Sequence, residues 1–231
     1  MRAAIIALAS FCIGAQAEAG AWPREKGTTF LSFSHVATTG TTTLLTPDFQ
    51  INNYTSVFAE HGLTDKLTIG LNAGVGGDDD YSVEAGYVFA RYPVWSDDSG
   101  HRVAAEIGFG LIEDEPDGRQ NRVIPGLSWG YGFESRWGGG WAGIEASADY
   151  RIQTGDTAWK ADVTLGLKPT YNWMLILQFQ NGLYPDAEPL VRLAPSIVRK
   201  LGARTHVQFG AIAGLVGDDS VGGKVAVWLS F

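Results

Sequence analysis

The sequence predicts an all-β protein that folds as a single antiparallel, up-and-down transmembrane β-barrel of about 12 strands. Three observations predict this fold class. Nearly the whole chain after residue 26 alternates apolar with polar or small residues, most alternating segments are about ten residues long, and their apolar faces carry almost no charge. A tilted strand crosses a bilayer in about ten residues, with an apolar face toward lipid and a polar face toward the lumen.

The alternation is clearest in the segment 66–76. There Leu67, Ile69 and Leu71 share one face, and Thr68 and Asn72 lie on the other. Successive strand residues point to opposite faces, so this segment is expected to form a strand with one apolar side. The expected strands span residues 27–38, 52–61, 66–76, 81–92, 102–112, 121–134, 141–152, 158–168, 173–181, 190–198, 204–215 and 224–231.

Aromatic residues near the segment ends favour a membrane barrel over a soluble β-sandwich, which would also alternate. Tryptophan and tyrosine collect at the two membrane–water interfaces, where an apolar ring and a polar group are both satisfied. One rim is expected to carry Trp95, Trp137, Trp141, Tyr171 and Trp173. The other rim is expected to carry Tyr54, Tyr81, Tyr150 and Trp159.

The start of the chain has the features of a cleavable signal peptide. A basic start precedes an apolar stretch over residues 3–13, and the A-x-A pattern of residues 15–17 follows. The apolar stretch is too short to span a bilayer as a helix. We therefore expect a signal peptide over 1–17 and a barrel domain over 18–231, and a cut after Ala19 fits almost equally well.

Composition excludes several classes of function. The formal net charge of −8 argues against a nucleic-acid partner, which would require a basic face. The only cysteine, Cys12, lies in the leader, and Phe11 before it argues against a lipoprotein signal. We expect no cofactor and no metal site, because the histidines and the cysteine lack metal-ligand spacing.

The last eight residues, Lys224 to Phe231, alternate up to the terminal phenylalanine. This ending resembles the C-terminal assembly signal of Gram-negative outer-membrane barrels. The resemblance implies export through the inner membrane, recognition by the barrel-assembly machinery, and an outer membrane with lipopolysaccharide around the barrel. The residues that match the signal are Val225, Val227, Leu229 and Phe231.

The segment Phe58 to Gly70 forms an expected strand, a turn and the start of the next strand. Gly62 and Asp65 suit the tight turn between the strands. This unit resembles the strand–turn–strand unit of transporter-like barrels named for the MetA pathway of phenol degradation. The resemblance implies uptake of small aromatic compounds.

The polar face of the predicted barrel is the candidate functional surface. Alternation places the following side chains in the lumen: Glu84, Glu106, Arg122, Glu134, Glu145, Asp149, Arg151, Lys160, Asp162, Lys168, Arg192, His206 and Lys224. We expect Glu106 to lie near Arg122 across one hairpin, and Asp149 and Arg151 to face Lys160 and Asp162 across the next. Unpaired buried charge is costly, so some of these charges are expected to pair.

The favoured function is a passive channel or transporter for small charged or aromatic solutes. Arg122, Arg151 and Arg192 have the bidentate geometry that suits carboxylates. The alternative is a non-transporting structural or surface barrel whose lumen is plugged by ion pairs. An enzyme is the least favoured, because the His-x-Ser pairing of outer-membrane phospholipases is absent and His61 and His101 are expected at the rim opposite the acidic loops.

Overall fold

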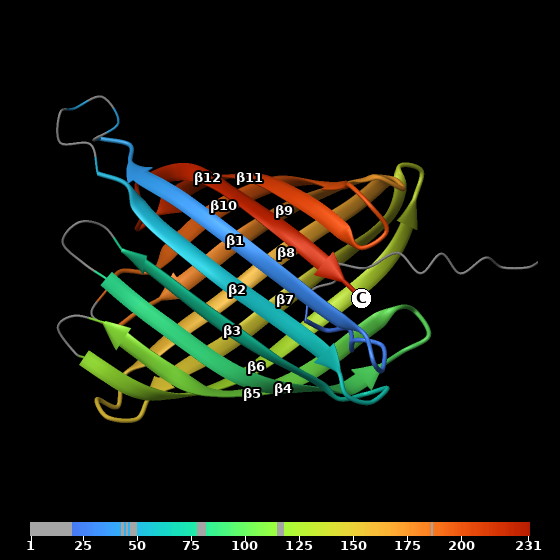
Figure 1. The fold of residues 1–231 in the computed structure, drawn as a ribbon, viewed down its shortest axis with the longest axis horizontal. Helices are drawn as coiled ribbons and strands as arrows, with labels where there is room; N and C mark the ends of the chain where they lie inside the picture. Colours follow the sequence, from blue (N-terminus) through green and yellow to red (C-terminus); the bar gives the residue numbers. More distant parts are fainter. Residues whose placement is uncertain are drawn as a thin grey trace, which may run out of the picture.

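The computed structural model describes residues 20–42, 44, 46, 50–77, 82–114, 118–185 and 187–231. Within these residues the chain forms 12 antiparallel strands in one closed barrel (Figure 1). None of the described residues belongs to a helix that is long and apolar enough to cross a bilayer. The strands are β1 (Thr29–Gly40), β2 (Asn52–Gly62), β3 (Thr68–Gly77), β4 (Ser82–Ser96), β5 (His101–Asp114), β6 (Gly118–Ser135), β7 (Gly138–Arg151), β8 (Thr157–Thr170), β9 (Trp173–Leu183), β10 (Leu190–Lys200), β11 (Thr205–Val216) and β12 (Ser220–Ser230).

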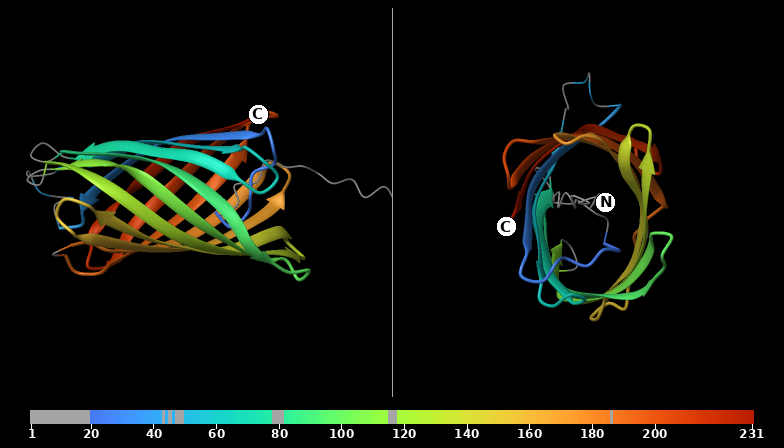
Figure 2. Two further views of the ribbon diagram at one scale, coloured as in Figure 1. Left: turned by 90° about the horizontal axis from the view of Figure 1, so that it is seen from below. Right: turned by 90° about the vertical axis from the view of Figure 1, so that its right-hand side faces the viewer.

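The barrel has the predicted up-and-down topology. Each strand pairs with its neighbours in sequence, and β1 closes the ring against β12 from Phe30 opposite Ser230 to Gly40 opposite Ser220. The right-hand view in Figure 2 looks into the resulting ring of strands. Closure satisfies the backbone hydrogen bonds of what would otherwise be edge strands, as a protein in lipid requires. The predicted fold class is therefore confirmed.

The strand boundaries differ from the expected ones mainly in length. The expected segment 121–134 becomes Gly118–Ser135, and the expected segment 224–231 begins earlier, at Ser220. Gly222 and Gly223 carry no apolar side chain that would mark this start, yet they pair with Thr38 and Ala37 of β1. Pairing with an existing neighbour therefore extends the strands beyond the part that the alternation marks.

The outer face of the barrel is apolar and exposed, as expected for a surface that contacts lipid. Val88 is 61% exposed and Leu127 is 60% exposed, although both lie in the middle of strands. The inner face holds a buried cluster near the barrel end at which β1 begins and β12 ends. That cluster consists of Phe30, Trp141, Met174, Ile176, Val198, Ala226 and Trp228. The lumen is thus partly filled at this end, which we call the terminal end.

The aromatic rims are largely as predicted. Trp137 and Tyr171 are exposed at turns of the terminal end, beside Trp95 and Trp173, and Tyr150 and Trp159 are exposed toward the opposite end. The expectation is wrong for Trp141, which is only 3% exposed and points into the lumen, and for Tyr54, which lines an inner pocket. Proximity to a strand end does not decide which face carries a ring. Tyr81 lies outside the described residues.

Candidate functional site in the barrel lumen

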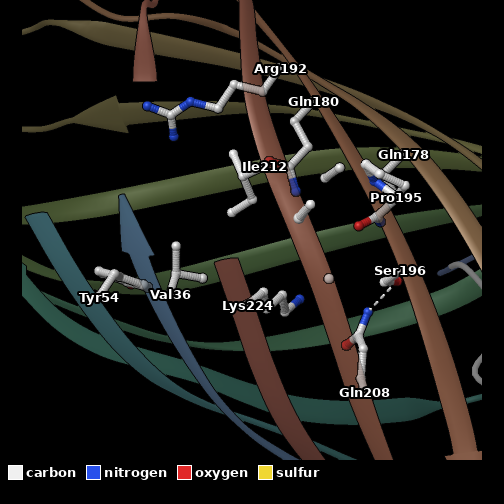
Figure 3. A pocket seen from close by; sticks show the side chains of 13 residues that line it. Val36, Tyr54, Gln178, Gln180, Arg192, Pro195, Ser196, Gln208, Ile212 and Lys224 are labelled. Atoms are coloured by element: carbon white, nitrogen blue, oxygen red, sulfur yellow. Dashed lines mark hydrogen bonds between the residues drawn. The ribbon is translucent and has the colours of Figure 1, made fainter. Parts of the chain in front are cut away.

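The barrel encloses a polar cavity of about 460 Å³. A second space of about 180 Å³ lies toward the other end of the barrel, on the side of β9 to β12. Figure 3 shows Lys224, Gln178, Gln180 and Gln208 around the second space, and these four side chains also line the larger cavity. The two spaces therefore adjoin, and amides and charges surround their junction.

The register places all the predicted lumen residues except Glu84 on the inward alternation. The cavity walls include Glu106, Glu145, Lys160, Asp162, Arg192 and Lys224. Arg122 and His206 are buried, and Glu134 lies at the exposed end of β6. The remaining members of the inward set are Asp149, Arg151 and Lys168.

The prediction for Glu84 is wrong, because β4 carries its lumen side chains at odd positions. Glu84 pairs with Val75 of β3, which is 50% exposed, and it lies on the same face as Val88. Tyr87 and Arg91 line the cavity instead. The segment 81–92 has apolar residues at both parities, so alternation alone cannot identify its inner face.

A chain of ion pairs crosses the terminal end of the lumen. Arg24 Nε lies 2.7 Å from Glu60 Oε2, and Arg91 Nη1 contacts the other oxygen of Glu60. Arg91 Nη2 lies 2.7 Å from Glu106 Oε2, and Arg91 Nε donates to the same oxygen at 2.9 Å. Arg91 and Glu60 are both buried, so each charge depends on its partner. Arg91 is the centre of this cluster, and we call the four residues the ion-pair chain.

Arg24 belongs to a stretch that precedes the first strand and enters the barrel. We call Gly20–Thr28 the inner segment; Figure 2 shows it in blue inside the ring of strands. Arg24 N donates to Thr68 Oγ1 at 3.0 Å, and Gly27 N donates to the carbonyl oxygen of Gly62 at 2.7 Å. Ala21 is fully buried. The inner segment is therefore packed and hydrogen-bonded inside the terminal end of the barrel.

Neither the inner segment nor the ion-pair chain was predicted. The inner segment has no alternation, so nothing in its sequence marks it as a lumen element. Arg91 has the same parity as Phe89 and Tyr87, which make this inner face resemble an apolar outer face. The signal that the sequence offers is the charge of Arg91 itself, since a basic residue on that face must avoid lipid.

The expected pair of Glu106 and Arg122 does not form. Glu106 lies opposite Gly126, and Arg122 lies opposite Gly110, so the register separates them by several residues. Arg122 Nη1 instead lies 2.6 Å from Asp149 Oδ2. The register depends on turn geometry that alternation does not reveal.

The expected cluster across β7 and β8 is also displaced. Lys160 lies opposite Ser147, and Asp162 lies opposite Glu145, rather than beside Asp149 and Arg151. Asp162 is within electrostatic reach of both Lys160 and Lys224. Among the described residues, no carboxylate lies within 4.0 Å of either ammonium group. The middle of the lumen therefore presents two amines, Lys160 and Lys224, to two acids, Asp162 and Glu145.

The loop after β11 holds the remaining arginine pair. Asp218 accepts hydrogen bonds from Arg192 Nε, from Ser220 N at 2.9 Å and from Ser220 Oγ at 3.0 Å. Burial raises the pKa of Asp218, but the bonds from Arg192 and Ser220 outweigh this effect and hold the pKa below its ordinary value of 3.8. Arg192 is therefore engaged at neutral pH.

We expect the Asp218→Asn substitution to lower barrel stability at neutral pH only. A depressed carboxyl pKa stabilises the fold above the ordinary value of 3.8, and this contribution is lost as the pH falls through the lowered pKa. Urea midpoints of the two proteins should therefore differ at neutral pH and converge in acid. Asp219→Asn is the matched control, because Asp219 has no arginine partner in the described part of the loop. A difference that persists in acid would contradict the assignment.

The predicted assembly signal lies at the end of β12. Val225 is 48% exposed, Val227 is 38% exposed and Phe231 is 55% exposed. Leu229 has the same parity and lies opposite Leu31 of β1. These four side chains form an apolar outer stripe beside the closing seam of the barrel. The stripe is the surface that the predicted signal would present.

Comparison with known proteins identifies the fold. No family model matches the chain, and no curated protein matches it. The structure is similar to the KdgM porin, with a TM-score of 0.60 and 10% identity over 87% of this chain and 99% of that one. It is also similar to the NanC porin, with a TM-score of 0.59 and 11% identity over 87% of this chain and 98% of that one. The COG4313 outer membrane channel from Pseudomonas putida F1 matches with a TM-score of 0.63 and 10% identity over 94% of this chain and 100% of that one. The chain therefore has the fold of outer-membrane barrels of the porin and channel type.

Proposed function

We propose that the protein is an outer-membrane channel through which small solutes pass passively. The polar cavity of about 460 Å³ inside the closed barrel carries this proposal. A barrel that served only as a membrane anchor would gain stability from a packed apolar interior, whereas this interior is lined by hydroxyls, amides and charges. The porin and channel fold supports the same reading.

Charged solutes fit the lumen, and we propose a preference for anions. Asp149 holds Arg122 and Asp218 holds Arg192, so two of the three arginines expected to bind carboxylates are already engaged. Lys160 and Lys224 carry the available positive charge near Asp162. Phe58, Tyr87 and Trp228 on the same walls would contact an aromatic part of a solute. Among similar structures, the KdgM porin has been solved in complex with disordered oligogalacturonate.

The same proposal includes the surroundings and the maturation of the barrel. We propose that outer-membrane lipid and lipopolysaccharide surround it, that a signal peptide is cleaved, and that the Phe231 ending is recognised during assembly. The exposed apolar outer face supports the membrane partner. The exposed stripe at the end of β12 supports recognition during assembly.

Planar-bilayer recording of the folded, heat-modifiable barrel tests the proposed function. A channel gives discrete current steps, and a salt gradient then reports its ion preference. Silence from a barrel whose folding has been verified would contradict the proposal. It would favour the second candidate, a structural barrel, which the ion-pair chain and the inner segment across the terminal mouth support.

We expect the Lys224→Gln substitution to shift the reversal potential toward cation preference. Lys224 lines both spaces, so its charge acts on every ion that passes their junction. Lys66→Gln is the matched control, since this substitution removes the same charge from the exposed turn between β2 and β3, outside the lumen. Equal reversal potentials for the Lys224 variant and the unchanged protein would exclude Lys224 from the selectivity filter.

A further inference from the structure

The first described residue, Gly20, makes a contact that the proposed channel does not explain. Gly20 is buried, and its backbone nitrogen donates to Glu145 Oε1 on β7. Among the described residues, no side chain of opposite charge lies within 4.0 Å of Glu145. The nitrogen of residue 20 is therefore the group placed to neutralise this carboxylate.

Glu145 belongs to a group of three carboxylates that lie around Arg91. Glu60, Glu106 and Glu145 all act electrostatically on Arg91. Among the described residues, Arg91 contacts Glu60 and Glu106, and Arg24 contacts Glu60. Glu145 is the one of the three acids that no described cation contacts. A peptide N–H at residue 20 would supply only a hydrogen bond to Glu145, whereas a free amino group would also supply a positive charge.

The site of residue 20 is shaped for a glycine. A Cβ atom there would lie 3.0 Å from Arg91 Cζ, so a larger residue would press against the centre of the ion-pair chain. The next residues are equally fitted. A Cβ atom at Gly130 of β6 would lie 2.9 Å from Ala21 Cβ and 2.3 Å from the Trp22 ring. Residues 20–22 are therefore closely packed against β4 and β6.

We propose that the mature chain begins at Gly20 and that its α-ammonium group is a structural cation paired with Glu145. Residues 17–19 read Ala-Glu-Ala, which is the A-x-A pattern that a signal peptidase requires immediately before the cut. Water hydrolyses the Ala19–Gly20 peptide bond, leaves a carboxylate on Ala19 and releases the amine of Gly20, which takes up a proton. Processing thus creates a cation in contact with Glu145.

Intact mass and N-terminal sequencing of the protein isolated from outer membranes test the position of the cut. The full-length chain is expressed with its own leader in a Gram-negative host. We expect a mature chain that starts at Gly20. A start at Glu18, at any other residue, or an uncut leader would overturn the proposal.

Refolded mature chains test the role of the ammonium group. One chain starts at Gly20, and the other starts at Glu18, so that its residue 20 carries a peptide nitrogen. We expect Glu145→Gln to lower the Tm clearly more in the first chain than in the second. Glu134→Gln is the control, because Glu134 is an exposed acid on the same inward alternation. This substitution should change the Tm by the same amount in both chains. Equal losses from Glu145→Gln in the two chains would overturn the proposed pair.

Discussion

Replacement of Arg91 by methionine is expected to destabilise the barrel by about 3–5 kcal/mol, because it leaves buried carboxylates without their counter-charge. Glu60 is 5% exposed and contacts Arg91 directly, and Glu106 lies 2.7 Å from its guanidinium group. Methionine fills a similar volume, so the loss would come from charge rather than from a cavity. Urea titration of the folded fraction, followed by heat modifiability on gels, measures the effect.

Two further variants separate this effect from a general intolerance of the lumen. Arg102→Met removes an exposed arginine from the inward face of β5, and no ion pair joins it to the described residues. It should leave the urea midpoint nearly unchanged. Arg91→Met combined with Glu60→Gln and Glu106→Gln should recover much of the loss, because the two carboxylates that pair with Arg91 are then uncharged. An equally unstable triple variant would show that Arg91 acts by packing and not by charge.

The Gly166→Val substitution is the second change with a large expected effect. Trp141 lies opposite Gly166 on the neighbouring strand, and a Cβ atom at Gly166 would lie 2.1 Å from the Trp141 indole carbons. The ring would have to leave the buried cluster that includes Phe30 and Met174. We expect a loss of about 1–3 kcal/mol, the usual cost of overpacking a fitted interior. Urea titration measures this loss.

Gly132→Val is the matched control for this substitution. Gly132 lies on the inward alternation of β6, and a Cβ atom there would meet nothing within 4 Å. Valine favours strands, so this variant should be neutral or slightly stabilising. Unchanged stability of the Gly166 variant would contradict this prediction, because it would mean that the Trp141 indole does not pack against Gly166.

Alternation predicted the strands well because a lipid-exposed barrel enforces it. Outward residues must be apolar and inward residues must tolerate water, so each strand carries the period in its own sequence. The segment 141–152 shows this clearly, since Ile144 is exposed outward while Glu145 lines the cavity. β4 is the exception, because its inward face carries Tyr87, which lines the cavity, and the buried Phe89, and these rings remove the contrast between its two faces.

The partners of the lumen charges could not be predicted in the same way. Glu106 pairs with Arg91 on β4 and not with Arg122 on β6, although all three are inward charges. The choice depends on register, and a shift of two residues retains the face but changes every neighbour. Arg24 lies outside the strands altogether, so its contact with Glu60 depends on a path of the chain that has no periodic signature.

The inner segment also bears on the order in which the barrel assembles. Within it, Arg24 and Gly27 contact Thr68, Glu60 and Gly62, all of which belong to β2 or β3, and Arg91, the next residue in the ion-pair chain, lies on β4. These strands are close in sequence to the segment, whereas the seam between β1 and β12 joins the two ends of the chain. Local contacts cost less loop-closure entropy than distant ones. We therefore expect residues 24–27 to dock on the open β2–β4 sheet before the seam closes, so that Glu60 and Arg91 are already paired when the barrel covers them.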